Sequence, residues 1–239
     1  MVLPLRRLGL AVLAALVLPQ AALAQAYQCR VPQGPVTLPT VERGGPIRQT
    51  RVTGYTLALT WSPEFCRFRA DSARHARMCS GRDGRFGFTV HGLWPEGAGG
   101  QWPQWCPARH QPSPWATAGA MCMMPDASLI AHEWARHGSC MTSDPDTYLR
   151  VTGILWRSLR WPDFDRLSRQ RGLTAGDVRR VFADANPYWE AEDVGIVLSN
   201  RGWLTEMRLC YGADFMPTAC DARRFGPEDE TRVSIWRGL

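Results

Sequence analysis

Residues 88–96 read FTVHGLWPE. A strand-like run over residues 88–90 is followed by His91, Trp94 and Pro95. Aromatic and branched side chains recur through residues 85–90, which predicts a β-strand leading into His91. Upstream, residues 54–61 (GYTLALTW) show the same alternation and are followed by Pro63. These two strands are therefore the predicted start of a β-sheet.

The rest of the chain mixes helices and strands. Apolar spacing and capping residues predict helices over residues 128–137, 145–161 and 173–185, and strands over 194–198 and 203–211. Asp126 or Ser128 can cap the first helix, and Thr174 with Asp177 forms a capping-box pattern. Residues 27–52 and 97–126 are rich in proline and glycine and are predicted to be irregular. Because no regular βαβ alternation appears, we predict an α+β fold.

Length and composition are those of one globular domain. The chain has 239 residues, of which 45% are hydrophobic and 21% charged, and this usage excludes a disordered chain. Glycine has no period of three, which excludes a collagen. Eight cysteines are too few to replace a core, so any disulfides support one.

The N-terminus has the pattern of an export signal. Arg6 and Arg7 precede an apolar run over residues 8–18, and Ala22-Leu23-Ala24 is a small-x-small cleavage site. The run is 11 residues long, whereas a membrane anchor needs about 20. We therefore predict a signal peptide over residues 1–24, a single domain over 25–239, and a periplasmic or secreted protein without a membrane anchor.

The basic side chains are all of one type. The 28 basic residues are all arginine, and the formal net charge is +6, of which two charges lie in the predicted signal peptide. A mildly basic protein favours a polyanionic partner, although this alone identifies none.

A second segment gathers further polar side chains. Residues 131–140 read AHEWARHGSC. On a helix with His132 at 0°, Arg136 lies at about 40°, Glu133 at about 100° and His137 at about 140°. Two imidazoles, a carboxylate and a guanidinium then share one face. The simplest alternative is a solvated helix face with no role in catalysis.

Two other chemistries fit this segment poorly. A zinc site of the HExxH type places its histidines four residues apart, whereas His132 and His137 are five apart and Arg136 would repel a cation. Cys140 is a poor nucleophile because export favours its pairing in a disulfide. We therefore expect no metal and no cofactor.

Phosphodiester chemistry on RNA fits better. RNA carries its own nucleophile, the 2′-hydroxyl, so a base and an acid suffice, and histidine can serve as either. A nearby cation stabilises charge on the phosphoryl oxygens, and Trp94 offers a face for base stacking. A polyanion-binding protein without turnover and a metallohydrolase are the weaker alternatives.

The two segments together resemble the active-site motifs of the ribonuclease T2 family. The matching residues are His91-Gly92-Leu93-Trp94-Pro95 and His132-Glu133-Trp134-x-Arg136-His137-Gly138-Ser139-Cys140, in the family's order. Trp61-Ser62-Pro63-Glu64-Phe65-Cys66 also resembles an early strand of the family. The resemblance implies an α+β fold around an antiparallel sheet. It also implies metal-independent cleavage of single-stranded RNA through a 2′,3′-cyclic phosphate to 3′-phosphate ends, with low base specificity, by a monomer without an obligate protein partner.

The resemblance also implies roles for individual residues. His91 and His137 would be the acid and base pair, His132 would hold the phosphate, and Glu133 with Arg136 would stabilise the pentacovalent phosphorus. Trp94 would stack on a base whose edge Glu96 contacts. Arginine at 136 departs from the family's usual lysine and replaces a point charge with a planar fork. Ser139 replaces the usual threonine, from which we expect little effect.

The family pattern suggests how the cysteines pair. It implies the bonds Cys66–Cys79 and Cys106–Cys140. Cys210–Cys220 is plausible, which leaves Cys29–Cys122 as the remaining pair, although eight cysteines allow 105 pairings.

Several residues outside the motifs could have either a functional or a purely structural role. The arginines at 67, 69, 74 and 77 could follow a phosphate backbone, but a solvated face is the simpler expectation. His75 and His110 are predicted to be isolated surface residues. The tryptophans at 102, 105 and 115 are predicted to pack or anchor loops rather than bind bases.

Overall fold

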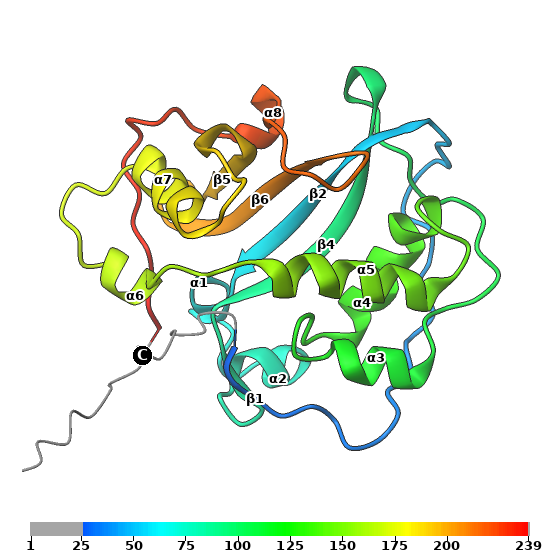
Figure 1. The fold of residues 1–239 in the computed structure, drawn as a ribbon. Helices are drawn as coiled ribbons and strands as arrows, with labels where there is room; N and C mark the ends of the chain where they lie inside the picture. Colours follow the sequence, from blue (N-terminus) through cyan, green and yellow to red (C-terminus); the bar gives the residue numbers. More distant parts are fainter. Residues whose placement is uncertain (1–25, 239) are drawn as a thin grey trace, which may run out of the picture.

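The computed structural model describes residues 26–238, which form an α+β fold around an antiparallel sheet (Figure 1). The sheet has the order β4-β2-β6-β5. A second, two-stranded sheet pairs β1 with β3. The strands are β1 (Ala26–Cys29), β2 (Val52–Trp61), β3 (Gly84–Phe86), β4 (Phe88–Gly97), β5 (Val194–Leu198) and β6 (Leu204–Gly212).

Eight α-helices and four short 3-10 helices lie among the described residues. The α-helices are α1 (Ser62–Cys66), α2 (Ala76–Cys79), α3 (Pro114–Ala120), α4 (Ala127–Arg136), α5 (Pro145–Ser158), α6 (Phe164–Leu167), α7 (Ala175–Ala185) and α8 (Ala222–Phe225). The 3-10 helices are η1 (Ala73–His75), η2 (Ala98–Gly100), η3 (Gly138–Cys140) and η4 (Ala191–Asp193).

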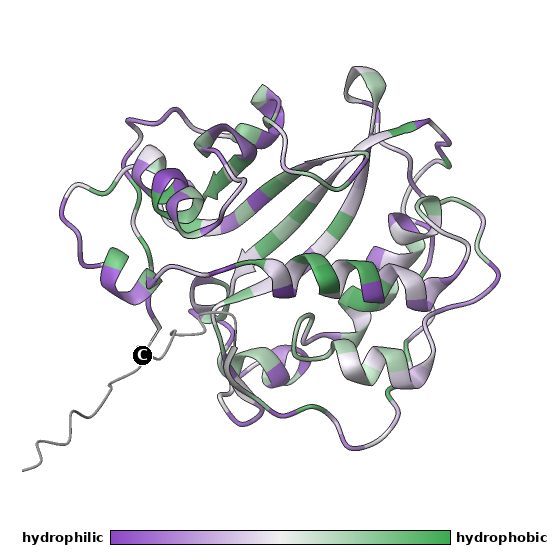
Figure 2. Ribbon diagram, viewed as in Figure 1, coloured by the Kyte–Doolittle hydropathy of each residue, from purple (hydrophilic) through white to green (hydrophobic). Residues whose placement is uncertain are grey.

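One face of the large sheet is apolar and holds the core. Leu57, Leu93 and Leu209 lie side by side on β2, β4 and β6, and all three are fully buried. Helices α4 and α5 contact β4, and α7 contacts β5 (Figure 1). The buried apolar residues of these helices and strands form one core cluster. Figure 2 shows hydrophobic residues recurring along β2, β4 and α5.

The other face of the sheet carries polar side chains, because neighbouring residues of a strand point to opposite faces. Thr56 on β2 is paired with Trp94 on β4 and with Cys210 on β6. Glu206 and Arg208 precede Cys210 at alternate positions of β6. The polar face is thus assembled from three strands, of which β6 lies more than 100 residues after β4 in the sequence.

Most elements predicted from the sequence are present. Strand β5 covers residues 194–198 as expected, and Thr174 and Asp177 form the expected capping box on α7. Asp126 rather than Ser128 caps α4. Strand β4 runs through the histidine–tryptophan motif to Gly97, beyond its predicted end.

The two segments predicted to be irregular are only partly so. Residues 97–126 contain α3, which begins at Pro114 after Ser113, and the Ser113 hydroxyl accepts a hydrogen bond from the Ala116 amide. A serine N-cap before proline is a helix start that the loop-like composition obscures. Residues 27–52 contain most of β1, which is held to β3 by backbone pairing.

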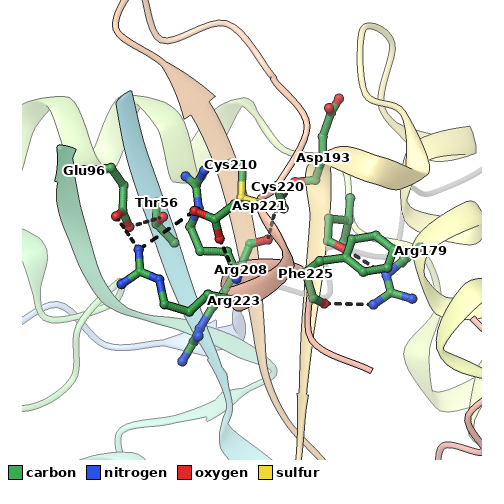
Figure 3. The surroundings of a disulfide bond; sticks show 12 residues. Thr56, Glu96, Arg179, Asp193, Arg208, Cys210, Cys220, Asp221, Arg223 and Phe225 are labelled. Atoms are coloured by element: carbon green, nitrogen blue, oxygen red, sulfur yellow. Dashed lines mark hydrogen bonds and ion pairs between the residues drawn. A yellow bond between two sulfur atoms is a disulfide. The ribbon is translucent and has the colours of Figure 1, made fainter. Parts of the chain in front are cut away.

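The structure contains the four expected disulfides, Cys29–Cys122, Cys66–Cys79, Cys106–Cys140 and Cys210–Cys220. The last joins β6 to the segment that leads into α8, and it places Arg223 near Glu96 (Figure 3). Disulfides stabilise a fold mainly by limiting the freedom of the unfolded chain.

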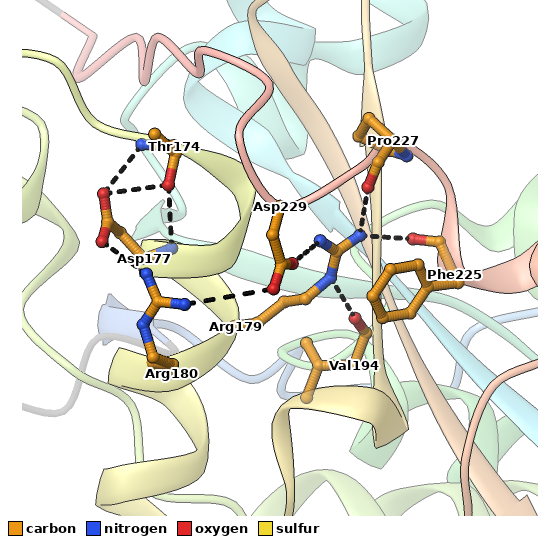
Figure 4. Close-up of polar contacts among 8 residues, drawn as sticks. All are labelled: Thr174, Asp177, Arg179, Arg180, Val194, Phe225, Pro227 and Asp229. Carbon is orange, nitrogen blue, oxygen red and sulfur yellow. Dashed lines mark hydrogen bonds and ion pairs between the residues drawn. The ribbon is translucent and has the colours of Figure 1, made fainter.

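A buried arginine fixes the C-terminal segment. The Arg179 guanidinium is fully buried and donates to the carbonyls of Val194, Phe225 and Pro227 and to the Asp229 carboxylate (Figure 4). Because each of these bonds satisfies a buried donor, losing the guanidinium would leave several carbonyls unpaired. This network holds the segment after α8 against α7.

The predicted signal peptide, residues 1–24, lies outside the described residues. Among residues 26–238, no helix is both long and apolar enough to span a membrane.

Candidate active site

The two histidine-containing segments meet where α4 crosses beside β4. The indole Nε1 of Trp94 donates to Glu133 Oε2 at 2.7 Å, and His91 Nε2 lies 3.7 Å from Glu133 Oε1. The Trp94 ring lies 5.2 Å from the His91 ring and 5.6 Å from the His137 ring, between centroids. Trp94 thus lies beside both imidazoles, and the Glu133 carboxylate lies beside Trp94 and His91.

Gly92 makes this close approach possible. A Cβ at position 92 would collide with the Glu133 carboxylate and lie 2.5 Å from Trp94 Nε1. Any side chain at this position would therefore separate α4 from β4 at the site.

His137 is fixed at the end of α4. It is the C-cap residue, is 7% exposed, and lies one residue beyond the helix. The Trp105 amide donates to the Arg136 carbonyl at 2.8 Å, and the Cys106–Cys140 disulfide closes the same turn. Burial and the neighbouring Arg136 charge lower the pKa of His137 to about 3. The imidazole is therefore neutral at any mildly acidic or neutral pH.

His91 has the opposite electrostatic setting. Its Nδ1 lies 2.8 Å from Glu206 Oε2, and Arg208 Nε donates to the other oxygen, Glu206 Oε1, at 2.8 Å. Burial alone lowers the pKa of His91, but the Glu206 hydrogen bond and the Glu133 and Glu206 charges outweigh it and raise the pKa. His91 is thus biased toward the protonated form, with Nε2 turned toward Glu133.

Glu133 is a buried carboxyl. It is 2% exposed, and burial raises its pKa to about 7, against the opposing effect of the nearby His91. A solvated helix face is therefore the wrong description of this part of α4, because Glu133 and His137 both point into the protein.

His132 and Arg136 complete the polar face of α4. The His132 ring stands edge-on to Trp105 at 5.5 Å, and burial together with the Arg136 charge lowers its pKa. The Arg136 Nε is buried and has no hydrogen-bond acceptor among residues 26–238. A buried donor without a partner is costly, so this guanidinium is suited to an anionic ligand.

Glu96 lies in the same region but is already engaged. Its Oε1 accepts from the Thr56 hydroxyl at 2.7 Å, and its Oε2 accepts from Arg223 at 2.9 Å (Figure 3). A contact between Glu96 and a base edge would have to share these oxygens or displace Arg223. The role expected for Glu96 therefore stays a prediction.

A cleft of about 930 Å³ opens beside this cluster, and His91, His132, Glu206 and Arg208 lie along it. No group of three or more histidine, cysteine, aspartate or glutamate side chains within residues 26–238 is arranged to hold a metal ion.

Comparison with known proteins supports one family. Residues 53–161 match the model of the ribonuclease T2 family. The chain is 30% identical over 125 residues to a probable ribonuclease of Haemophilus influenzae, covering 48% of this chain and 46% of that protein. It is 27% identical over 218 residues to ribonuclease I of Escherichia coli, covering 73% of this chain and 80% of that protein. These matches support the ribonuclease T2 family for this chain.

Solved structures share the fold of this chain. An RNase-related protein from Calystegia sepium has a TM-score of 0.61 and 19% identity, covering 78% of this chain and 98% of that one. Trichomaglin, described as an S-like ribonuclease, has a TM-score of 0.60 and 20% identity, covering 77% and 97%.

The structure adds residues to the candidate site that the two sequence motifs did not indicate. Glu206 and Arg208 support His91, and Arg223 binds Glu96. The alternation of Glu206 and Arg208 along β6 could be read from the sequence, but the pairing of β6 with β2 could not. His75, predicted to be isolated, is instead partly buried and lies 3.8 Å from Asp126, whereas His110 is exposed as expected.

Proposed function

We propose that this protein is a metal-independent endoribonuclease that cleaves single-stranded RNA by transphosphorylation. The observation that carries the proposal is the pair of histidines with opposite electrostatic settings. His137 has its pKa lowered to about 3, whereas the pKa of His91 is raised. A pair of groups whose environments push their pKa values apart is suited to act as base and acid.

In the first step, neutral His137 takes the proton of the 2′-hydroxyl. The 2′-oxygen forms a bond to phosphorus, the bond from phosphorus to the 5′-oxygen breaks, and protonated His91 gives its proton to the leaving oxygen. The product is a 2′,3′-cyclic phosphate. In the second step water attacks the ring with the two roles reversed, and a 3′-phosphate results. We assign the base to His137 because burial keeps it neutral.

The remaining polar groups of α4 are suited to the phosphate. Arg136 supplies a positive charge and a buried, unpartnered Nε donor. His132 offers a ring nitrogen, and Glu133, with a pKa near 7, can donate its own proton to a phosphoryl oxygen under acidic conditions. Donors placed where negative charge develops are often a large part of catalysis.

Trp94 is the candidate base-stacking residue. It is half-buried, and its Nε1 is held by Glu133, so its ring orientation is fixed. Stacking on an aromatic ring tolerates any base, which fits low base specificity. The solved structure of RNase NT is a complex with 5′-AMP, which supports nucleotide binding as a property to test in this fold.

The export pattern and the disulfides support a periplasmic or secreted enzyme. All eight cysteines are paired, as suits an oxidising compartment. Removal of residues 1–24, action as a monomer and the lack of a membrane or obligate protein partner belong to the same proposal.

The deciding experiment incubates the processed, oxidised protein with a short RNA in excess EDTA and reads the products by mass spectrometry. We expect fragments ending in cyclic phosphate and 3′-phosphate, and we expect the matching DNA to stay intact because it lacks the 2′-hydroxyl. Intact RNA with a folded protein would favour a binding protein without turnover. Loss of cleavage on chelation would favour a metal-dependent hydrolase.

Glu206→Gln tests the electrostatic support of His91. The variant keeps an oxygen near Nδ1 but removes the charge that helps raise the pKa of His91. The acid must be protonated, and a lower pKa leaves less of it protonated as the pH rises. We expect the alkaline limb of kcat/KM to move to lower pH and activity at pH 7 to fall by about tenfold.

A matched variant, Glu230→Gln, removes a carboxylate from an exposed position remote from the histidines. It should keep the wild-type pH profile. An alkaline limb that stays in place in Glu206→Gln would show that Glu206 does not control His91.

A further inference from the structure

The four arginines between residues 67 and 77 divide into two pairs with different surroundings. Arg67 pairs with Glu64 at 3.5 Å and lies 4.2 Å over the Trp236 ring. Arg77 pairs with Asp83 at 3.4 Å and donates to the Arg30 carbonyl. These two guanidiniums hold parts of the chain together.

The other two arginines line the cleft that contains His91 and His132. Arg69 and Arg74 are both exposed. Arg69 donates to the Phe65 carbonyl at 2.7 Å and lies 4.3 Å over the Phe65 ring, while Arg74 has no carboxylate partner among residues 26–238. Both positive charges are thus available at the wall of the catalytic cleft.

The segment that carries them is held in place relative to α4. The Cys66–Cys79 disulfide closes it, and residues 66–79 are called the bridged loop from here on. His75 stands edge-on to Phe65 at 5.1 Å, and its Nδ1 lies 3.8 Å from Asp126 Oδ2. Asp126 is the N-cap of α4, the helix that carries His132. The loop is therefore anchored to the catalytic helix.

An aromatic side chain directly precedes Arg69 in the sequence and lines the same cleft as the two charges. Phe68 is 78% exposed, which is unusual for a phenylalanine, and it lines the same cleft. Exposed aromatic rings interleaved with arginines are the surface that binds single-stranded nucleic acid, because bases stack and phosphates pair. At about 930 Å³, the cleft is near the upper end of the usual volume for small-molecule sites.

Four carboxylates also line the cleft, and three are engaged. Glu206 binds His91 and Arg208. Glu64 pairs with Arg67, and Asp126 caps α4 and faces His75. Glu42 is exposed and has no ion-pair partner within residues 26–238. Glu42 is thus the charge that opposes a polyanion here.

We propose that the bridged loop is an extended RNA-binding surface. Arg69 and Arg74 bind phosphates of the strand beyond the cleaved linkage, and Phe68 stacks on one of its bases. The inference rests on the proposed ribonuclease activity, and it specifies the substrate as a polynucleotide strand longer than the two nucleotides that flank the scissile phosphate.

The test compares a dinucleoside monophosphate with an octanucleotide. For the wild type, kcat/KM should be higher for the longer substrate. In Arg69→Gln/Arg74→Gln, we expect the octanucleotide-to-dinucleotide ratio to fall roughly tenfold. Arg166→Gln/Arg171→Gln removes two exposed arginines outside the cleft and should keep the wild-type ratio.

Binding is measured separately with a 2′-O-methyl octanucleotide, which the protein cannot cleave. The slope of log Kd against log salt should become shallower by about 1.4 in the double variant, or about 0.7 for each phosphate that the variant no longer neutralises. Glu42→Gln should change the affinity in the opposite direction and tighten binding.

The outcomes separate the two proposals. A dinucleotide that is not cleaved at all contradicts the ribonuclease proposal. Cleavage of the dinucleotide with no advantage of length, or a double variant that matches its Arg166/Arg171 control in ratio and salt slope, overturns the extended surface alone.

Discussion

His137→Ala should lower kcat/KM for RNA by about three orders of magnitude, and His91→Ala should do the same. The two losses have different causes in the proposed mechanism, in which His137 takes the proton of the 2′-hydroxyl and His91 protonates the leaving 5′-oxygen. A substrate with a 4-nitrophenolate leaving group needs no acid. His91→Ala should therefore recover most of its activity on uridine 3′-(4-nitrophenyl phosphate), whereas His137→Ala should not.

Controls separate chemistry from folding. His110→Ala removes an exposed imidazole and should leave kcat/KM unchanged. His137 is buried, so His137→Asn, which keeps much of the side-chain volume, should lose as much activity as His137→Ala while keeping the wild-type Tm. Recovery of His137→Ala but not of His91→Ala on the activated substrate would reverse the assignment of base and acid.

The sequence predicted the two segments of the site but not the way they face each other. A helical wheel places Glu133 between His132 and His137, and it carries no information about what lies opposite. In the structure Trp94 of β4 lies there, and Gly92 allows the approach. Burial of Glu133, which raises its pKa, is therefore a property of packing between two segments about forty residues apart.

The support of His91 shows the same limit. The strand containing Glu206 and Arg208 was predicted within one residue of its observed bounds, and its alternation puts both side chains on one face. Glu206 and Arg208 can support His91 only because β6 pairs with β2. This pairing places Glu206 beside Thr60 and within reach of His91. Strand order is set by the global fold, so local periodicity could not predict this contact.

Arg136→Ala should lower kcat by about 10²-fold to 10³-fold, the cost typical of removing a donor that stabilises developing charge. The guanidinium is close enough to lower the pKa values of His132, Glu133 and His137, and its buried Nε has no acceptor in residues 26–238. A phosphate in contact with the guanidinium would pair its positive charge. Arg136→Lys keeps the positive charge but loses the planar guanidinium group. We therefore expect it to retain more activity than Arg136→Ala.

The pH profile distinguishes a direct role from a structural one. Burial lowers the pKa of His137 most and the Arg136 charge lowers it further, so removing that charge should raise the pKa part of the way toward its ordinary value. The base must be neutral, and a higher pKa leaves it protonated over more of the acidic range. The acid limb of kcat/KM should therefore move to higher pH in Arg136→Ala and much less in Arg136→Lys. Equal acid limbs in wild type and Arg136→Ala would mean that this charge does not act on His137, and a full loss of activity in Arg136→Lys would mean that the planar fork itself is required at the phosphate.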